Sequence, residues 1–258
     1  MTHYPFQLIS DLHVQSGEYE WSRYVTKQSG VETLVVLGDV MRLVDYNAYL
    51  HVMRGFCENF ETVYLVPGNH EFYIDATDRV NTHNNLVQRL YELEHTLTNL
   101  TLLYNRHVDL PGNIRLYGTI LWCNVPIDEN YLTLPIKKND GDWVDGHWLS
   151  EQNDIDVAKL ELVIKQAKVD GKRLVVASHY PPSEQCLVEK YKTSDLRHYY
   201  SNNLYSMLCK ESVYVWMYGH THDSMDFRTE GDCRVVSNQV GRRDGWVGAK
   251  VVWVKNME

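Results

Sequence analysis

Largely apolar runs alternate with amphipathic stretches along most of the chain. Runs of this kind are typical of strands in a parallel sheet that is covered on both faces. The predicted buried strands are 6–10, 33–37, 62–66, 173–177 and 213–217. The stretches between them predict helices at 45–58, 77–97, 151–169 and around 194–210. This alternation of strands and helices predicts an α/β fold.

The spacing of apolar residues predicts which helix faces meet the core. In the second helix the apolar stripe consists of Leu86, Leu90, Leu93 and Leu97. In the first helix Leu50, Met53 and Cys57 recur at spacings of three and four. Ser150 is the predicted N-cap of the third helix, and Gly171 is its predicted end.

Shorter alternating segments predict additional strands, at least partly antiparallel. Two such segments lie within 101–122, where Pro111-Gly112-Asn113 is a hairpin turn signal. Closing strands are predicted at 226–228, 234–237 and 246–254. We treat the chain, 1–258, as one domain, because single α/β domains reach this length.

The segment 123–150 shows little periodicity. Long irregular loops in compact domains are usually functional or disordered. This one is rich in aromatic residues, so we expect a lid over a site. Tyr131, Trp143 and Trp148 are candidates for stacking on a nucleobase, with packing in the core or lid as the alternative.

Polar residues follow five of the predicted strands. They are Asp11 and His13, Asp39, Asn69, His179, and the pair His220 and His222. Side chains two residues apart in an extended segment point the same way, and strand ends in open α/β sheets are where ligands bind. Any one of these fragments is more often an ordinary surface or turn residue. Their joint occurrence at strand ends predicts a metal site.

The chemistry of the set narrows the choice of metal. Two carboxylates, one amide oxygen and four imidazoles exceed the needs of one ion and suit two ions that share a carboxylate. Mixed nitrogen and oxygen ligands suit divalent manganese, iron, cobalt, nickel or zinc, and we expect Mn²⁺. No cysteine belongs to the set, which argues against a closed structural zinc site.

Composition and charge constrain the partners. The formal net charge of −9 disfavours an extended nucleic-acid surface, but it allows a small phosphate ester beside bound cations. Five scattered cysteines without a C-x-x-C pair fit a reducing compartment. No signal peptide or membrane-length apolar run is visible, so we expect a cytoplasmic protein.

The order of these motifs resembles the calcineurin-like metallophosphoesterase superfamily. The motifs are Asp-x-His at 11–13, Gly-Asp at 38–39, Gly-Asn-His-Glu at 68–71, His179 and Gly-His-Thr-His at 219–222. The resemblance implies a four-layer αββα sandwich of two mixed sheets. It also implies one metal bound by Asp11, His13, Asp39 and His222, and a second bound by Asp39, Asn69, His179 and His220. Asp39 would then bridge the two ions.

The same resemblance implies phosphoester hydrolysis. Two ions about 3.5–4 Å apart would lower the pKa of a shared water and produce a hydroxide that attacks phosphorus. His70 is the candidate catalytic residue, as a general acid or charge stabiliser for the leaving group. The alternative for His70 is a supporting residue behind a ligand, and we expect such a role, or a helix start, for Glu71.

Departures from the family pattern limit which branches of the superfamily the chain resembles. The second motif continues Val-Met-Arg-Leu-Val, and Tyr180-Pro181 follows His179, unlike protein Ser/Thr phosphatases. His70 stands where lipid-A-pathway pyrophosphohydrolases carry arginine. What remains is similar to small bacterial or phage phosphoesterases of poorly defined substrate. We therefore expect hydrolysis of a phosphomonoester or a phosphodiester, with a nucleotide among the candidate substrates. Arg242 and Arg243 are candidate substrate-binding residues, as are Lys137 and Lys138.

Two alternatives of other classes stay open at this point. One is a catalytically silent relative that uses the same sandwich as an interaction module, although such relatives usually lose ligand histidines. The other is a metal-dependent amide hydrolase. That class is expected to carry His-x-His on an early strand, and Asp11-Leu12-His13 does not fit it.

Overall fold

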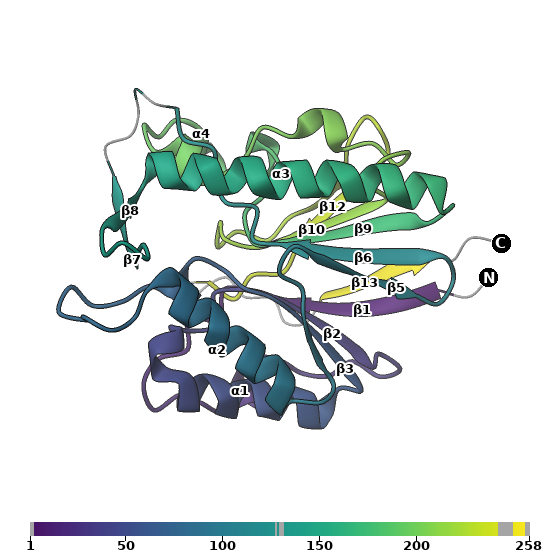
Figure 1. Cartoon of the computed structure of the whole chain (residues 1–258). Coiled ribbons are helices and arrows are strands. Elements are labelled where there is room, and N and C mark those ends of the chain that lie inside the picture. The colour runs from purple at the N-terminus through teal and green to yellow at the C-terminus, as the bar shows by residue number, and fades with distance from the viewer. Residues whose placement is uncertain (1–2, 127, 129–131, 242–249, 256–258) are drawn as a thin grey trace.

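Two mixed β-sheets lie face to face, and helices cover their outer faces, in the computed structural model of this chain (Figure 1). The structure describes residues 3–126, 128, 132–241 and 250–255. Helices α1 (Tyr46–Asn59) and α2 (His83–Thr96) cover one sheet, and α3 (Gly146–Val169) covers the other. This arrangement confirms the predicted four-layer αββα sandwich of two mixed sheets.

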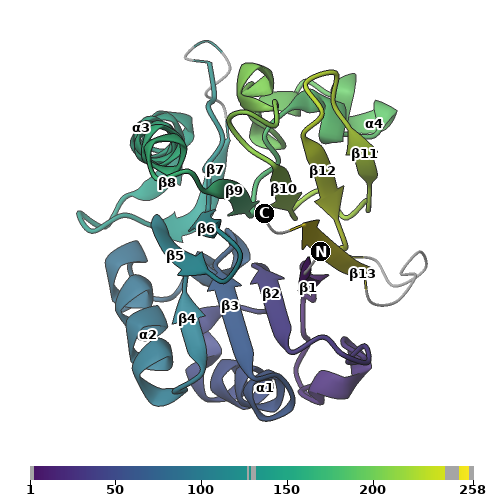
Figure 2. The same ribbon diagram turned by 90° about the vertical axis from the view of Figure 1, so that its right-hand side faces the viewer.

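The first sheet has the strand order β13-β1-β2-β3-β4. Its strands are β13 (Lys250–Lys255), β1 (His3–Ile9), β2 (Thr33–Leu37), β3 (Thr62–Val66) and β4 (Leu100–Leu102). Neighbours from β1 to β4 are parallel, and β13 is antiparallel to β1 (Figure 2). The carboxyl ends of β1, β2 and β3 therefore meet at one edge.

The second sheet has the strand order β11-β12-β10-β9-β6-β5. Its strands are β11 (Asp226–Arg228), β12 (Arg234–Ser237), β10 (Val215–Tyr218), β9 (Arg173–Ser178), β6 (Ile114–Thr119) and β5 (Arg106–Leu110). The predicted turn at 111–113 joins β5 and β6 as an antiparallel hairpin. Strands β6, β9, β10 and β12 are parallel, so their carboxyl ends also share an edge.

Continuous apolar strands form because both faces of each sheet are covered. On β2, Val35 and Leu37 pack in the core between the sheets, whereas Leu34 and Val36 pack against the helix side. The second sheet contributes Val175 to the core between the sheets in the same way. Because no face is left to water, the strands read as unbroken hydrophobic runs.

The two helices on the first sheet differ in detail from the predictions. All four leucines of the predicted α2 stripe are buried. The helix begins at His83 rather than at 77, because Thr82 is its N-cap and accepts from the Asn85 amide. In α1 only Met53 of the predicted stripe is fully buried; Leu50 and Cys57 are half-buried, and the buried face consists of Tyr49, Val52, Met53, Gly55 and Phe56.

The segment 123–150 is more regular than predicted. It contains the hairpin β7 (Thr133–Lys137) and β8 (Trp143–Asp145), and α3 begins within it. Ser150 is not the N-cap: the Asp145 carboxylate accepts from the Trp148 amide at 3.0 Å, and Ser150 bonds to Val125 instead.

The aromatic residues of that segment have separate outcomes. The Trp148 ring packs edge-on against buried Trp122, and Trp143 packs against the same core. The alternative of core packing therefore accounts for both tryptophans. Tyr131 lies outside the described residues, and the lid role of 123–150 stays a prediction.

The predicted helix around 194–210 is wrong. The chain there forms 3-10 turns at Arg197–Tyr199 and Tyr205–Met207, and a four-residue helix α4 (Glu189–Lys192) precedes them. The backbone instead bonds across to the turn after β9: the Asn202 amide donates to Pro181 O, and the Leu204 amide donates to Pro182 O. These hydrogen bonds to a distant turn of the same chain satisfy amides that helical hydrogen bonds would otherwise satisfy.

The described part of the last strand is Lys250–Lys255; 246–249 of the predicted strand lie outside the described residues. Among the described helices, none combines the length and the apolar character that crossing a membrane requires.

Candidate metal centre

The seven predicted ligands lie together where strands of both sheets end. Asp11 and His13 follow β1, Asp39 follows β2 and Asn69 follows β3. His179 follows β9, and His220 and His222 follow β10. Two groups of side chains that could hold a metal result, Asp11-His13-Asp39-His222 and Asp39-His179-His220, each with ligand atoms within 4.8 Å of one another.

The first group is closed by contacts between imidazoles and carboxylates. His13 Nε2 and His222 Nε2 lie 2.8 Å apart. His222 Nε2 lies 3.6 Å from Asp11 Oδ1, and His13 Nε2 lies 3.8 Å from Asp39 Oδ2. Two atoms that each coordinate one ion at about 2.1 Å are separated by about 3–4 Å, so these spacings fit a shared cation.

The second group adds the predicted amide oxygen. Asn69 Oδ1 lies 2.9 Å from His179 Nε2 and 3.1 Å from His220 Nδ1. His179 Nε2 also lies 3.4 Å from Asp39 Oδ1. The two oxygens of Asp39 therefore face different groups, Oδ2 the first and Oδ1 the second. This placement allows Asp39 to bridge two cations.

The backbone at five of the seven residues is left-handed, a conformation that is uncommon outside glycine. The φ angles are 55° at Asp11, 43° at His13, 54° at Asp39, 74° at His220 and 58° at His222. Backbone bonds hold this shape: the Asp11 amide donates to Gly38 O, and the His13 amide donates to Asp39 O, both at 3.0 Å. Clusters of such residues are typical of functional sites.

Close backbone approach explains one of the motif glycines. A Cβ on Gly68 would collide with Asp39 Oδ1 and would lie 2.7 Å from His179 Cε1. The absent side chain leaves the space in which Asp39 meets the second group.

Carbonyl oxygens behind the histidines orient the rings. His179 Nδ1 lies 2.8 Å from Leu37 O, and His220 Nε2 lies 3.3 Å from Tyr199 O. A proton on each of these nitrogens leaves His179 Nε2 and His220 Nδ1 free to bind a cation. Both rings therefore present a lone pair to the same region.

Glu71 is a buried support for the Asp39 turn. Its carboxylate accepts from the amides of Asp39, Val40 and Gly68 at 2.8–2.9 Å, and from the Tyr49 hydroxyl at 3.2 Å. Burial and the nearby Asp39 raise the pKa of Glu71 to about 7. Its position behind the site agrees with the supporting role expected from the sequence.

The charged groups of the cluster shift one another's pKa values, so that protons are held where cations would bind. Burial opposes protonation of His179, but the Asp39 and Asp11 carboxylates and the Leu37 carbonyl together outweigh it and raise the pKa of His179 to about 9. Burial raises the pKa of Asp11 to about 7 and lowers the pKa of His13 to about 4. A cation bound between Asp39 and His179 would replace the imidazolium proton.

His70, the predicted catalytic residue, lies beside the two groups. Its Nε2 is 4.0 Å from Asp39 Oδ2, its side chain is 39% exposed, and its ring stacks on Tyr73. Burial lowers the pKa of His70, and the Asp39 charge only partly opposes this.

Of the other predicted substrate-binding residues, Lys137 and Lys138 are not part of this cluster. Arg242 and Arg243 lie outside the described residues. Lys137 is buried and donates to Asp78 O at 2.7 Å. Lys138 lies 4.0 Å from the carboxylates of Asp140 and Asp142.

Sequence reasoning missed two residues that hold ligands in place. Gln239 Oε1 accepts from the His222 amide at 2.6 Å, and its amide nitrogen donates to Thr221 Oγ1 at 2.8 Å. The Tyr73 hydroxyl accepts from Asn69 Nδ2 at 2.8 Å. Tyr73 lies four residues after Asn69, a spacing that can bring two side chains together on a helical turn, so the sequence offered a signal for this contact. For Gln239 there is no nearby residue pattern that would indicate its contact with His222.

A pocket of 570 Å³ opens next to the first group. Its lining includes His13 and His222 together with Gln15, Glu18 and Tyr191. The pocket gives a small solute direct access to the cluster.

Comparison with known proteins agrees with this arrangement. The model of the calcineurin-like phosphoesterase family matches residues 4–224. An uncharacterised protein of Acanthamoeba polyphaga mimivirus is 23% identical over 221 residues, which cover 81% of this chain and 78% of that protein.

Solved structures share the fold at low sequence identity. The phosphopantetheinyl hydrolase of Mycobacterium tuberculosis superposes with a TM-score of 0.68 at 17% identity, covering 96% of this chain and 95% of that one. A dimetal phosphatase of Danio rerio gives 0.53 at 16% identity, covering 91% and 86%. The family match over most of the length decides the assignment: this chain belongs to the calcineurin-like phosphoesterase family.

Proposed function

We propose that this protein hydrolyses a small phosphate ester with the help of two divalent cations, Mn²⁺ being the expected ion. The observation that carries the proposal is the placement of Asp39, whose two oxygens face two separate groups of ligands. Family membership implies a binuclear centre and phosphoester hydrolysis. The donor atoms fit such a centre in type and spacing.

When bound, two such cations supply positive charge for the phosphoryl oxygens and an activated water as nucleophile. The chain supplies the rest. Asp11 and Asp39 bring two buried negative charges that would hold the cations, and the left-handed backbone fixes where they point. Gly68 leaves the space that this close approach needs.

His70 is proposed to assist departure of the alcohol. Its lowered pKa keeps the imidazole neutral near pH 7, so the ring offers an N–H donor to the oxygen of the leaving group. Stacking on Tyr73 fixes the ring plane, and its exposed edge allows contact with a substrate.

The pocket beside His13 and His222 supports a substrate with a small organic group, and monoesters and diesters are both candidates. A phosphopantetheinyl ester belongs among the compounds to test, because a structural relative is named for that activity. All five cysteines are unpaired thiols, which supports a reducing, cytoplasmic setting.

The test is hydrolysis of p-nitrophenyl phosphate and bis-p-nitrophenyl phosphate by protein loaded with Mn²⁺, with metal content measured in parallel. We expect turnover of at least one compound, loss of turnover after chelation, and recovery when Mn²⁺ is added back. Protein that is folded and holds two ions but turns over neither ester would instead favour the silent interaction module.

A further inference from the structure

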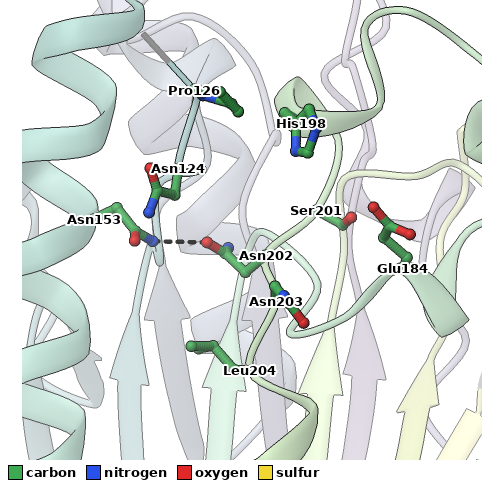
Figure 3. Close-up of a pocket in the computed structure, with 9 residues that line it drawn as sticks. All are labelled: Asn124, Pro126, Asn153, Glu184, His198, Ser201, Asn202, Asn203 and Leu204. Atoms are coloured by element: carbon green, nitrogen blue, oxygen red, sulfur yellow. Dashed lines mark hydrogen bonds between the residues drawn. The ribbon is translucent and has the colours of Figure 1, made fainter.

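A second pocket lies at the same edge of the sandwich as the metal centre. It has a volume of 280 Å³ and sits above the carboxyl ends of the strands, between α3 and the segment 198–204 (Figure 3). Polar side chains dominate its lining, among them Asn124, Asn153, Glu184, His198, Ser201 and Asn202. The proposed phosphoester chemistry does not use any of them.

The floor of this pocket is rigid. Asn153 Nδ2 donates to Trp122 O at 2.5 Å and to Asn202 Oδ1 at 2.7 Å. Asn202 Nδ2 donates in turn to Leu121 O at 3.0 Å. Both asparagines are 4% exposed. Polar groups fixed in this way before binding are typical of a recognition site.

Ser201 leaves a buried hydroxyl unused. The residue is 4% exposed, and its Oγ has no hydrogen-bond partner. A buried polar group without a partner destabilises a protein by about 1–3 kcal/mol, so such groups are rare and require an explanation. A hydrogen-bonding ligand in the pocket is an explanation that the location itself provides.

The charge of the lining selects against an anion. Among the described residues that line the pocket there is no lysine or arginine, and Glu184 adds a negative charge. A phosphate group therefore belongs at the metal centre and not here. The asparagine and serine side chains suit an uncharged group that carries several hydroxyls. The volume lies slightly below the roughly 300 Å³ of small-molecule sites, so it is sufficient for about one ring.

The turn that lines the pocket also contacts the second ligand group. His220 Nε2 lies 3.3 Å from Tyr199 O, and the nearby residues His198 and Ser201 line the pocket. Two trans peptide units span at most about 7.6 Å between Cα atoms, so the Cα atoms of Tyr199 and Ser201 lie within that distance of each other. A phosphate ester bound at the ligand group would have to extend its organic arm past the His220 ring to reach the pocket.

We propose that this pocket binds an uncharged, hydroxyl-bearing ring of the substrate, and that Ser201 is a specificity-determining residue. The inference rests on the proposed phosphoesterase function and names the substrate class as a sugar phosphate or a larger ester that contains one. The ring hydroxyls would bond to Ser201 and to the side chains of Asn124 and Asn203, which also line the pocket, while the phosphate lies at the metal centre.

The test compares two phosphates that differ only in ring hydroxyls, ribose 5-phosphate and tetrahydrofurfuryl phosphate. We expect the wild type to prefer the ribose compound in kcat/KM by at least about tenfold, since each lost hydrogen bond is worth about 1 kcal/mol. Ser201→Ala should raise KM for ribose 5-phosphate about 5- to 10-fold. It should leave kinetics on tetrahydrofurfuryl phosphate and p-nitrophenyl phosphate within about twofold.

Matched controls separate recognition from a structural effect. Ser206→Ala changes an exposed serine five residues after Ser201, outside the described pocket lining, and should not change the kinetics on either substrate. The melting temperature of Ser201→Ala should equal or exceed that of the wild type, because the variant removes a buried hydroxyl without a partner. Equal KM values for wild type and Ser201→Ala on ribose 5-phosphate would overturn the inference.

A binding measurement keeps the inference independent of turnover. Saturation-transfer NMR with D-ribose on metal-free protein should detect contact in the wild type and lose it in Asn203→Trp, which places an indole at an exposed position of the lining. Ribose contact without hydrolysis of any ester would retain the pocket and reject the phosphoesterase. Ester hydrolysis without ribose contact or hydroxyl preference would retain the phosphoesterase function and reject the proposed role of the pocket.

Discussion

At the residue scale, the backbone rather than a bound ion sets the directions of most candidate ligands. Residues other than glycine in the left-handed region are strained by about 1–3 kcal/mol each, and five such residues occur in this one cluster. The chain holds them there with backbone bonds and with the buried Glu71 carboxylate. Backbone and Glu71 hydrogen bonds therefore contribute to the geometry of the centre in addition to anything that a cation would contribute.

Replacement of the bridging carboxylate should disable the centre. Asp39→Asn keeps the shape of the side chain but removes the negative charge and one oxygen that faces a ligand group. We expect loss of both metals or of nearly all turnover, measured as metal content per chain and as hydrolysis of p-nitrophenyl phosphate. Asp154→Asn, on the exposed side of α3, is the control. Near-normal turnover by Asp39→Asn would refute the two-metal assignment.

Removal of the His70 imidazole should act on the leaving group. His70→Ala should keep the metals and slow poor leaving groups more than activated ones, by about 10²–10⁴-fold for the former. The measurement is kcat/KM for a series of phosphate esters with different alcohol pKa values. An equal loss across the series would remove His70 from the acid role.

His83 should make the fold sensitive to acid. Burial among Phe72 and Trp148 lowers the pKa of His83 to about 4, whereas the unfolded value is near 6.5. The unfolded state therefore binds more protons between pH 6.5 and 4, so stability is retained above pH 6.5 and falls as the pH decreases through this window. The effect reaches about 3 kcal/mol.

His83→Leu should flatten that dependence in urea unfolding measured from pH 7 to pH 4. His95→Leu, at an exposed position of the same helix, should leave the wild-type slope unchanged. A slope that persists in His83→Leu would assign the acid sensitivity to other groups.

At the element scale, the turn after β3 decides the spacing of the second ligand group. Gly68→Ala would place a methyl group against Asp39 Oδ1 and His179 Cε1, so a ligand or the turn must move. We expect reduced metal content and activity with little loss of secondary structure, measured by metal analysis and circular dichroism.

Gly171→Ala is the contrasting control for that turn. Its φ of +65° is strained for alanine, but no atom lies within 4 Å of the added methyl. This variant should lose about 1–2 kcal/mol of stability and retain its metals. Full metal content in Gly68→Ala would show that the turn adapts.

The elements that could be predicted from sequence are those whose signal is local. Strands β2 and β3 have the predicted limits, because continuous apolar runs end abruptly at Gly38 and Pro67. Polar residues at the ends of parallel strands share an edge of their own sheet, and for this reason the sequence could indicate that Asp11 and Asp39 lie near each other and that His179 and His220 do. The allocation of ligands to two groups required the family resemblance.

The failures occur where distant contacts override local pattern. The segment around 194–210 has helix-compatible spacing, yet its amides bond to Pro181 and Pro182. Asp145 caps α3 because Ser150 is occupied with Val125. Gln239 accepts a hydrogen bond from the His222 amide 17 residues away, and no local pattern predicts such a contact.

At the scale of the whole molecule, β13 completes the first sheet by pairing with β1 along its length. Val252 is fully buried between the sheets, whereas its neighbour Val251 faces the other side and is half-buried. Val252→Ala should lower the free energy of unfolding by about 2 kcal/mol, because it removes two buried carbons and leaves a cavity.

Val251→Ala is the matched control for that strand, and it should cost clearly less in the same urea titration. Equal losses for both variants would contradict the assigned faces of β13.

Each ligand group draws on both sheets: the first joins β1 and β2 to the end of β10, and the second joins β2 and β3 to β9 and β10. Bound cations would thus link the two sheets and oppose sliding of one sheet over the other. A small substitution in the core between the sheets, such as Val175→Ala, should then weaken the binding of cations at the distant metal centre.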